Sequence, residues 1–104
     1  MSIKAPREKE FLGQVVQLAR LLGWLVYHTH DSRRSAAGFP DLALCHPRLG
    51  RLVLAELKVR GRRPSAEQGR WLAALRAAGA TAYLWTPADW PAIERVLRDG
   101  PPSG

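Results

Sequence analysis

Two charged side chains interrupt an otherwise apolar segment and are the first candidates for chemistry. Glu56 and Lys58 lie within residues 51–59, whose other members are mostly Leu, Val and Ala. Such a run is typical of a buried β-strand, on which residues two apart point to the same face. A carboxylate and an ammonium are costly to bury there unless they pair with each other or bind a metal ion. The spacing therefore indicates either a structural pair or a catalytic one.

A second carboxylate, Asp41, begins the preceding apolar run. Residues 46–50, His-Pro-Arg-Leu-Gly, separate the two runs, so we expect a β-hairpin with a longer loop. If the chain turns about residues 48 and 49, Asp41 falls opposite Glu56 on the same face, with Cβ atoms about 5 Å apart. Two carboxylates so placed repel each other unless a cation lies between them, and Mg²⁺ at about 2.1 Å from each oxygen would satisfy both. A slip of one residue would turn Asp41 away, and Asp41 could instead simply end the Gly-Phe-Pro turn before it.

Glu8 is the third acid of interest, and helical phase selects it over Glu10. Glu8 precedes Phe11, Leu12 and Val15 by three, four and seven residues, which places it on the core-facing stripe of a first helix. Glu10 lies on the opposite side and is expected to face water. Glu8 could therefore reach a site at the edge of the sheet. The alternative is that it only complements the helix macrodipole.

Carboxylates and a lysine around a hard cation suit the hydrolysis of phosphodiester bonds. The metal ion would acidify a bound water and neutralise the phosphate, and the lysine would position the water or stabilise developing negative charge. Arginines in the two flanking polar loops are candidates to grip DNA phosphates without reading sequence, although each alone could be a solvated surface charge. They are Arg33, Arg34, Arg60, Arg62 and Arg63.

The elements that would position these residues follow from periodicity and from turn residues. We expect a helix from Pro6 to Gly23, then a strand over residues 24–29 and a polar loop to residue 38. The hairpin strands 41–45 and 51–59 come next. A helix over residues 65–79, a strand over 80–85 and a third helix capped by Thr86 and Pro87 complete the pattern. The order α-β-β-β-α-β-α predicts an α/β fold, with a mixed central sheet of about four strands flanked by helices.

The length and net charge of the chain indicate one small domain that binds a polyanion. The chain has 104 residues and a net charge of +7, which favours nucleic acid as partner over a membrane surface, or reflects only solubility and composition. We expect a single domain over residues 1–98 and a flexible tail over 99–104. The lone Cys45 excludes an internal disulfide and fits a cytoplasmic protein. We find no signal peptide and no apolar run of the roughly 20 residues that a membrane span needs.

The histidines offer a weaker alternative. His28 and His30 share one face of the first strand or its end, and with Cys45 and His46 they could suggest zinc. No tight ligand spacing follows, however, so contact between His28 and a DNA phosphate is the preferred interpretation.

Three motifs together resemble the VRR-NUC family of PD-(D/E)XK, restriction-endonuclease-like nucleases, over residues 8–97. A bare Pro-Asp followed by Glu-x-Lys is common by chance, but the added glycine, the basic turn and the helix start make the match specific. The motifs are Gly38-Phe39-Pro40-Asp41-Leu42, Glu56-Leu57-Lys58 and Ser65-Ala66-Glu67-Gln68.

The resemblance implies a restriction-endonuclease-like core and a role for each matching residue. Asp41, Glu56 and the backbone carbonyl of Leu57 would bind Mg²⁺ or Mn²⁺, and Lys58 would assist the attacking water. Glu8 would be the helix-borne acid near the same metal. Gln68 would point into the site from the second helix. A capping box with Ser65 explains Gln68 equally well.

The resemblance further implies a metal-dependent DNA endonuclease. Similar single-domain members look like homodimeric resolvases of Holliday junctions, which cut branched DNA. The alternatives are a nuclease of flap, nicking or general specificity, and a DNA-binding module with an inert site. An activity on RNA is disfavoured because no aromatic stacking motif is present.

Overall fold

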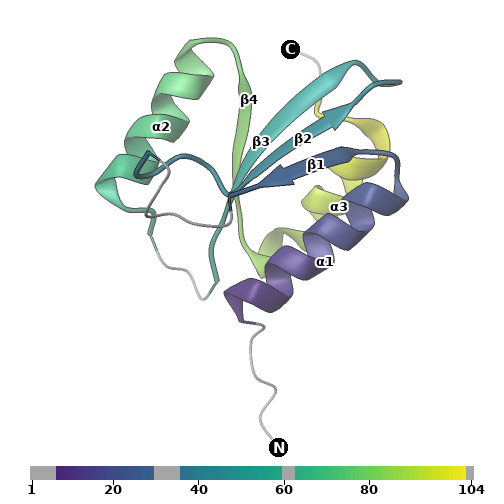
Figure 1. Cartoon of the computed structure of the whole chain (residues 1–104), viewed down its shortest axis with the longest axis horizontal. Helices are drawn as coiled ribbons and strands as arrows, with labels where there is room; N and C mark the ends of the chain where they lie inside the picture. Colours follow the sequence, from purple (N-terminus) through teal and green to yellow (C-terminus); the bar gives the residue numbers. More distant parts are fainter. Residues whose placement is uncertain (1–6, 30–35, 60–62, 103–104) are drawn as a thin grey trace, which may run out of the picture.

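The computed structural model describes residues 7–29, 36–59 and 63–102. Its elements follow the order predicted from the sequence, α-β-β-β-α-β-α, with a short 3₁₀ turn, η1, added before the last helix (Figure 1). They are α1 (Glu8–Leu21), β1 (Leu25–His28), β2 (Leu42–His46), β3 (Arg51–Leu57), α2 (Ala66–Ala77), β4 (Thr81–Trp85), η1 (Pro87–Asp89) and α3 (Trp90–Asp99).

The described strands form one mixed sheet in the order β1-β2-β3-β4. β1 pairs with β2, and β2 with β3, in antiparallel fashion, whereas β3 and β4 are parallel. Parallel neighbours need a crossover connection, and α2 supplies it. β3 therefore lies centrally, paired on both sides, and carries the acid singled out from the sequence.

The hairpin register is the predicted one. Leu42 pairs with Ala55 and His46 with Arg51, so one step further along the ladder Asp41 faces Glu56. The β2 and β3 strands are shorter at this end than the sequence indicated, because β2 begins after Asp41 and β3 ends at Leu57. The backbone donors that would continue the ladder are instead taken by side-chain carboxylates, as described below.

Helices cover the sheet on both faces, and two apolar clusters result. α1 and α3 lie together against one face, where the buried side chains of Phe11, Val15 and Ile93 meet Val53 and Leu57 of β3. α2 lies on the other side (Figure 1) and packs Leu72 against Leu54 and Ala82. β3 thus alternates between the two clusters. Glu56, which shares the parity of Leu54, points toward the α2 face.

The end of the chain packs more closely than the sequence indicated. We expected a flexible tail from residue 99, but α3 includes Asp99, and Gly100 and Pro101 are buried. Gly100 adopts a φ of 83° and turns the chain back, and the guanidinium of Arg51 donates a hydrogen bond to the carbonyl of Pro101 at 3.0 Å. The described part of the tail, up to residue 102, therefore belongs to the fold.

Candidate active site

The two central carboxylates are locked to each other's strands. The backbone N–H of Asp41 donates to Oε1 of Glu56 at 3.2 Å, and the N–H of Leu57 donates to Oδ2 of Asp41 at 2.8 Å. Each acid thus accepts a hydrogen bond from the strand that carries the other. This reciprocal arrangement fixes both carboxylates at the point where β2 begins and β3 ends, which is the proximity that the hairpin register predicted.

Glu56 is the unusual member of the pair. Its side chain is 1% exposed, and its second oxygen, Oε2, is buried without a hydrogen-bond partner among the described residues. Burial raises its pKa to about 8, helped by a side-chain hydrogen bond with Asp41 and by the negative charge of Asp41, while Lys58 and the hydrogen bond from the backbone N–H of Asp41 oppose the rise. With only protein around it, this carboxyl is therefore mostly protonated at neutral pH.

This environment fits a divalent cation. A cation beside Oε2 would satisfy the orphaned oxygen, offset the repulsion between the two carboxylates and favour the ionised form of Glu56. The oxygen donors suit Mg²⁺ or Mn²⁺ rather than a soft metal. Asp41 and Glu56 are the two carboxylates that lie together here, and the predicted part of the Leu57 carbonyl in holding a metal stays a prediction.

Glu8 shares a cleft with Asp41, whereas Glu56 is not among the residues that line it. Glu8, Lys9 and Leu12 of α1 form one wall, Asp41 and Leu57 form the other, and the enclosed volume is about 250 Å³. Helical phase thus correctly separated Glu8 from Glu10, which does not line the cleft. Within the described ranges, however, no three His, Cys, Asp or Glu side chains come close enough together to hold one metal ion. Glu8 therefore lies across from Asp41 rather than within the acidic pair.

Lys58 lies immediately beyond β3. Its backbone N–H donates to the carbonyl of Trp85 at 2.9 Å, which continues the parallel pairing with β4 for one residue. Strand alternation places its side chain on the same face as Glu56. The half-buried lysine is close enough for its charge to lower the pKa of Glu56.

Gln68 takes the capping role that the sequence left open. Its Oε1 accepts a hydrogen bond from the backbone N–H of Ser65 at 2.8 Å, and its own N–H donates to Oγ of Ser65 at 3.2 Å. This reciprocal box begins α2 and satisfies two donors of the helix N-terminus. Gln68 does not line the cleft, and its predicted contact with the reaction centre stays a prediction.

The loop before Asp41 is docked on α2, a support that the sequence did not reveal. Gly38 has a φ of 88°, and a Cβ there would lie 2.4 Å from the carbonyl carbon of Glu67. The indole of Trp71 donates to the carbonyl of Ala37 at 3.1 Å and packs edge-on against Phe39, with ring centroids 5.1 Å apart. The left-handed conformation of Gly38 permits this close approach. The Gly-Phe-Pro segment before Asp41 is therefore held against α2. The available signal was a glycine three residues before the aspartate.

The predicted DNA-contacting residues divide into two groups. Arg63 is exposed in the segment that leads to α2, and half-buried His28 ends β1 opposite Leu42, the residue that follows Asp41. The others, with His30, lie outside the described residues: Arg33, Arg34, Arg60 and Arg62.

The histidine of the hairpin has a structural role instead of a metal-binding one. Nδ1 of His46 accepts from the N–H of Leu49 at 3.1 Å, and Nε2 is 3.0 Å from the carbonyl of Leu22, to which it donates in the matching tautomer. Both ring nitrogens are thereby used to join the hairpin loop to the end of α1. The neighbouring Cys45 is exposed.

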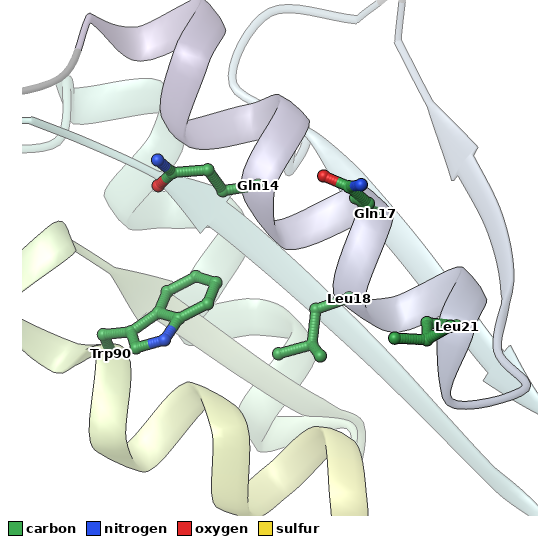
Figure 2. A pocket seen from close by; sticks show the side chains of 5 residues that line it. All are labelled: Gln14, Gln17, Leu18, Leu21 and Trp90. Carbon is green, nitrogen blue, oxygen red and sulfur yellow. The ribbon is translucent and has the colours of Figure 1, made fainter.

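A larger hollow lies away from the acids. It measures about 500 Å³ and lies between α1 and α3 (Figure 2). Uncharged side chains line it, so it offers no acid, base or metal ligand for hydrolysis. They are Gln14, Gln17, Leu18, Leu21 and Trp90.

Comparison with known proteins identifies the family. Residues 4–88 match the family model described as VRR-NUC domain. The chain belongs to the VRR-NUC family. VRR-NUC domains are a nuclease family of the PD-(D/E)XK class.

Solved VRR-NUC structures share this fold. One, titled "VRR_NUC domain protein", superimposes with a TM-score of 0.69 at 18% identity and covers 93% of this chain and 96% of its own. Another, titled "VRR_NUC domain", has a TM-score of 0.63 at 26% identity, over 84% of this chain and 94% of its own. The predicted fold class is thereby confirmed. Among curated proteins, none matches this sequence. No helix in the described residues is long and apolar enough to cross a membrane.

Proposed function

We propose that this VRR-NUC domain is a Mg²⁺- or Mn²⁺-dependent endonuclease that hydrolyses phosphodiester bonds in DNA. The observation that carries the proposal is the buried Oε2 of Glu56, which lacks a partner among the described residues and lies beside a second carboxylate. Buried polar atoms without a partner are rare in native proteins, and a bound ion is one of the recognised reasons for them. Membership of a nuclease family and a net charge of +7 support DNA as the substrate.

The residues divide the work of hydrolysis among them. Asp41, Glu56 and the carbonyl of Leu57 would hold the cation, which when bound supplies positive charge to the phosphate and acidifies water. Lys58, on the face of Glu56, donates hydrogen bonds to the attacking water and to the negative charge that grows on phosphate oxygen. The water oxygen forms the new bond to phosphorus and gives up a proton to solvent, the P–O bond to the leaving strand breaks, and the departing oxygen takes up a proton from solvent. Glu8 contributes a further acceptor from the opposite wall of the cleft.

Phosphate contacts along the strand come from the basic loops. We propose that Arg33, Arg34, Arg60, Arg62 and Arg63, together with His28, hold the DNA backbone. The exposed Arg63 and the position of His28 beside the start of β2 support this arrangement. Contacts of this kind fix the position of the duplex and carry no sequence preference.

A finer proposal concerns the form of the substrate and of the enzyme. We propose a homodimer that prefers branched DNA, since a two-fold axis would present two sites to a symmetric junction. An apolar row on one sheet face supports the homodimer: the register places Leu25, Cys45 and Leu52 side by side, and all three are exposed. A row of this kind is typical of a surface that a second subunit covers.

A cleavage assay tests these proposals in one design. Labelled four-way, flap and linear duplexes are incubated with the protein and Mg²⁺, Mn²⁺ or EDTA, beside Asp41→Ala and Lys58→Ala. Asp99→Asn, an exposed acid remote from the cleft, is the control. Cutting only with metal, and only by the wild type and the control, supports the mechanism. Cutting that persists in EDTA or in Asp41→Ala refutes it.

The same material tests substrate form and assembly. Equal cutting of linear and branched DNA would refute the preference for branches alone. Sedimentation of the wild type as a monomer at micromolar concentration would refute the homodimer. If the apolar row is the interface, Leu25→Arg dissociates the dimer, whereas Arg48→Glu in the exposed hairpin loop leaves it intact.

A further inference from the structure

The cleft beside the acidic pair has a cationic wall residue without an assigned role. Lys9 lines it together with Glu8 and Leu12, opposite Asp41 and Leu57. At 100° per residue, Leu12 falls between Glu8 and Lys9 around the axis of α1. The carboxylate and the ammonium therefore flank one helical face, with an apolar floor between them.

Lys9 is available for a ligand. It is exposed, and it takes part in no hydrogen bond or ion pair with the rest of the described chain. Its ammonium group lies on a flexible four-carbon stem and carries three donors. Acids surround the cleft, yet none of them engages this side chain in a salt bridge.

Lys9 and Lys58 lie toward opposite faces of the sheet. Lys58 follows β3 on the parity of Glu56, toward the face that α2 covers. Lys9 approaches from α1, which covers the opposite face. Lys58 therefore acts on Glu56 from one face of the sheet, while Lys9 shares a cleft with Asp41 on the other. A DNA phosphate drawn toward two carboxylates meets repulsion, which a nearby cationic side chain reduces.

We propose that Lys9 binds a phosphate of the DNA strand at the mouth of the cleft, next to the bond that is cut. The inference rests on the proposed nuclease function and adds a phosphate-positioning residue to it. Lys9 holds the strand from the α1 side while Lys58 acts at the reaction centre. Because a phosphate contact of this kind is electrostatic, its contribution falls as salt rises.

The first test is the salt dependence of DNA binding, measured in EDTA by fluorescence anisotropy with a short labelled duplex. Lys9→Ala is compared with Lys9→Arg and with Arg20→Ala, which removes an exposed cation from the far end of the same helix. Lys9→Ala is expected to weaken binding roughly 3- to 10-fold and to reduce the slope of log K against log salt by about 0.9. Lys9→Arg and Arg20→Ala keep the wild-type slope.

The second test is Mn²⁺ binding without DNA, measured by calorimetry. An ammonium beside the acids repels a cation, so Lys9→Ala is expected to bind Mn²⁺ roughly 2- to 5-fold more tightly. Weaker DNA binding together with tighter metal binding cannot arise from partial unfolding, which would weaken both. Equal loss of DNA affinity in Lys9→Ala and Arg20→Ala, or an unchanged salt slope, overturns the proposal.

The proposed nuclease function and the role of Lys9 can be refuted separately. A wild type that binds DNA but cuts none of the substrates with Mg²⁺ or Mn²⁺ refutes the proposed function, and the salt slope still reports whether Lys9 contacts phosphate. A wild type that cuts normally while Lys9→Ala keeps its salt slope refutes only the role of Lys9.

Discussion

Replacing Glu56 by Gln should change how the stability of this protein depends on pH. Gln has the shape and hydrogen-bonding capacity of a protonated Glu but cannot ionise. The wild-type carboxyl is 1% exposed and has a pKa raised to about 8 from 4.5. Ionising it inside the fold is therefore costly, and the Gln variant escapes that cost.

The sign follows from proton binding in the two states. Between pH 4.5 and about 8, the native protein keeps a proton on Glu56 that the unfolded chain has released. The free energy of unfolding therefore falls as pH rises through this window and levels off above it. The stabilisation that protonated Glu56 contributes is fully present below pH 4.5, the pKa in the unfolded chain. It is lost as the pH rises through about 8, the pKa in the native protein. The difference between the two pKa values corresponds to a fall in the free energy of unfolding on the order of 3–5 kcal/mol.

Urea unfolding at pH 5, 6, 7, 8 and 9 measures this loss. The difference between Glu56→Gln and the wild type isolates one group, because other titrations are shared. Relative to the wild type, the variant is expected to gain most of that free energy between pH 5 and 8. Glu67→Gln, at an exposed acid of α2, should follow the wild-type curve.

Metal addition gives the second half of the test. At pH 8, Mn²⁺ should stabilise the wild type strongly and Glu56→Gln much less, since a ligand that binds only the native state adds RT ln(1 + [L]/Kd). A difference between the two proteins that stays constant from pH 5 to 9 would refute the argument from burial. Equal stabilisation of both by Mn²⁺ would refute the assignment of Glu56 as a ligand.

Three further outcomes follow from the site. Glu8→Gln is expected to reduce cleavage roughly 10- to 100-fold, whereas Glu10→Gln cuts as the wild type does; equal rates for the two would exclude Glu8 from the reaction. Gly38→Ala should lower the free energy of unfolding by about 2–4 kcal/mol in thermal melts, because a Cβ there meets the backbone of Glu67, whereas Gly13→Ala, in open space on α1, should raise it by about 0.5–1 kcal/mol. Removing divalent metal with EDTA should abolish cleavage of every substrate, and activity that survives dialysis against EDTA would contradict a metal-dependent mechanism.

The sequence predicted most of the fold and the central contact of the site, for a definite reason. Strand alternation and a turn about residues 48 and 49 together set a register, and that register placed Asp41 opposite Glu56 as observed. Helical phase likewise put Glu8 on the cleft and Glu10 outside it. Both inferences used a fixed period of side-chain direction, which sequence displays directly.

The remaining features depend on contacts between distant segments. Nothing local predicts that the carboxylate of Asp41 accepts a hydrogen bond from Leu57, because this bond replaces a rung of the ladder. The packing of Gly100 and Pro101 depends on Arg51, about 50 positions earlier in the chain. The structural role of His46 depends likewise on the carbonyl of Leu22. A single sequence shows the groups involved without showing which of them meet.

The docking of the Asp41 loop on α2 links activity to local unfolding. The segment before Asp41 is held by Trp71 through Ala37 and Phe39, so the first turns of α2 and this loop should open as one cooperative unit. Amide protons of the two should then exchange at one common rate, separate from that of the α1 and α3 layer. Opening of α2 removes the support of the loop before Asp41 and leaves its carboxylate held only from β3, while the rest of the sheet stays folded. Heat should therefore inactivate the enzyme at a lower temperature than the one at which its main core melts.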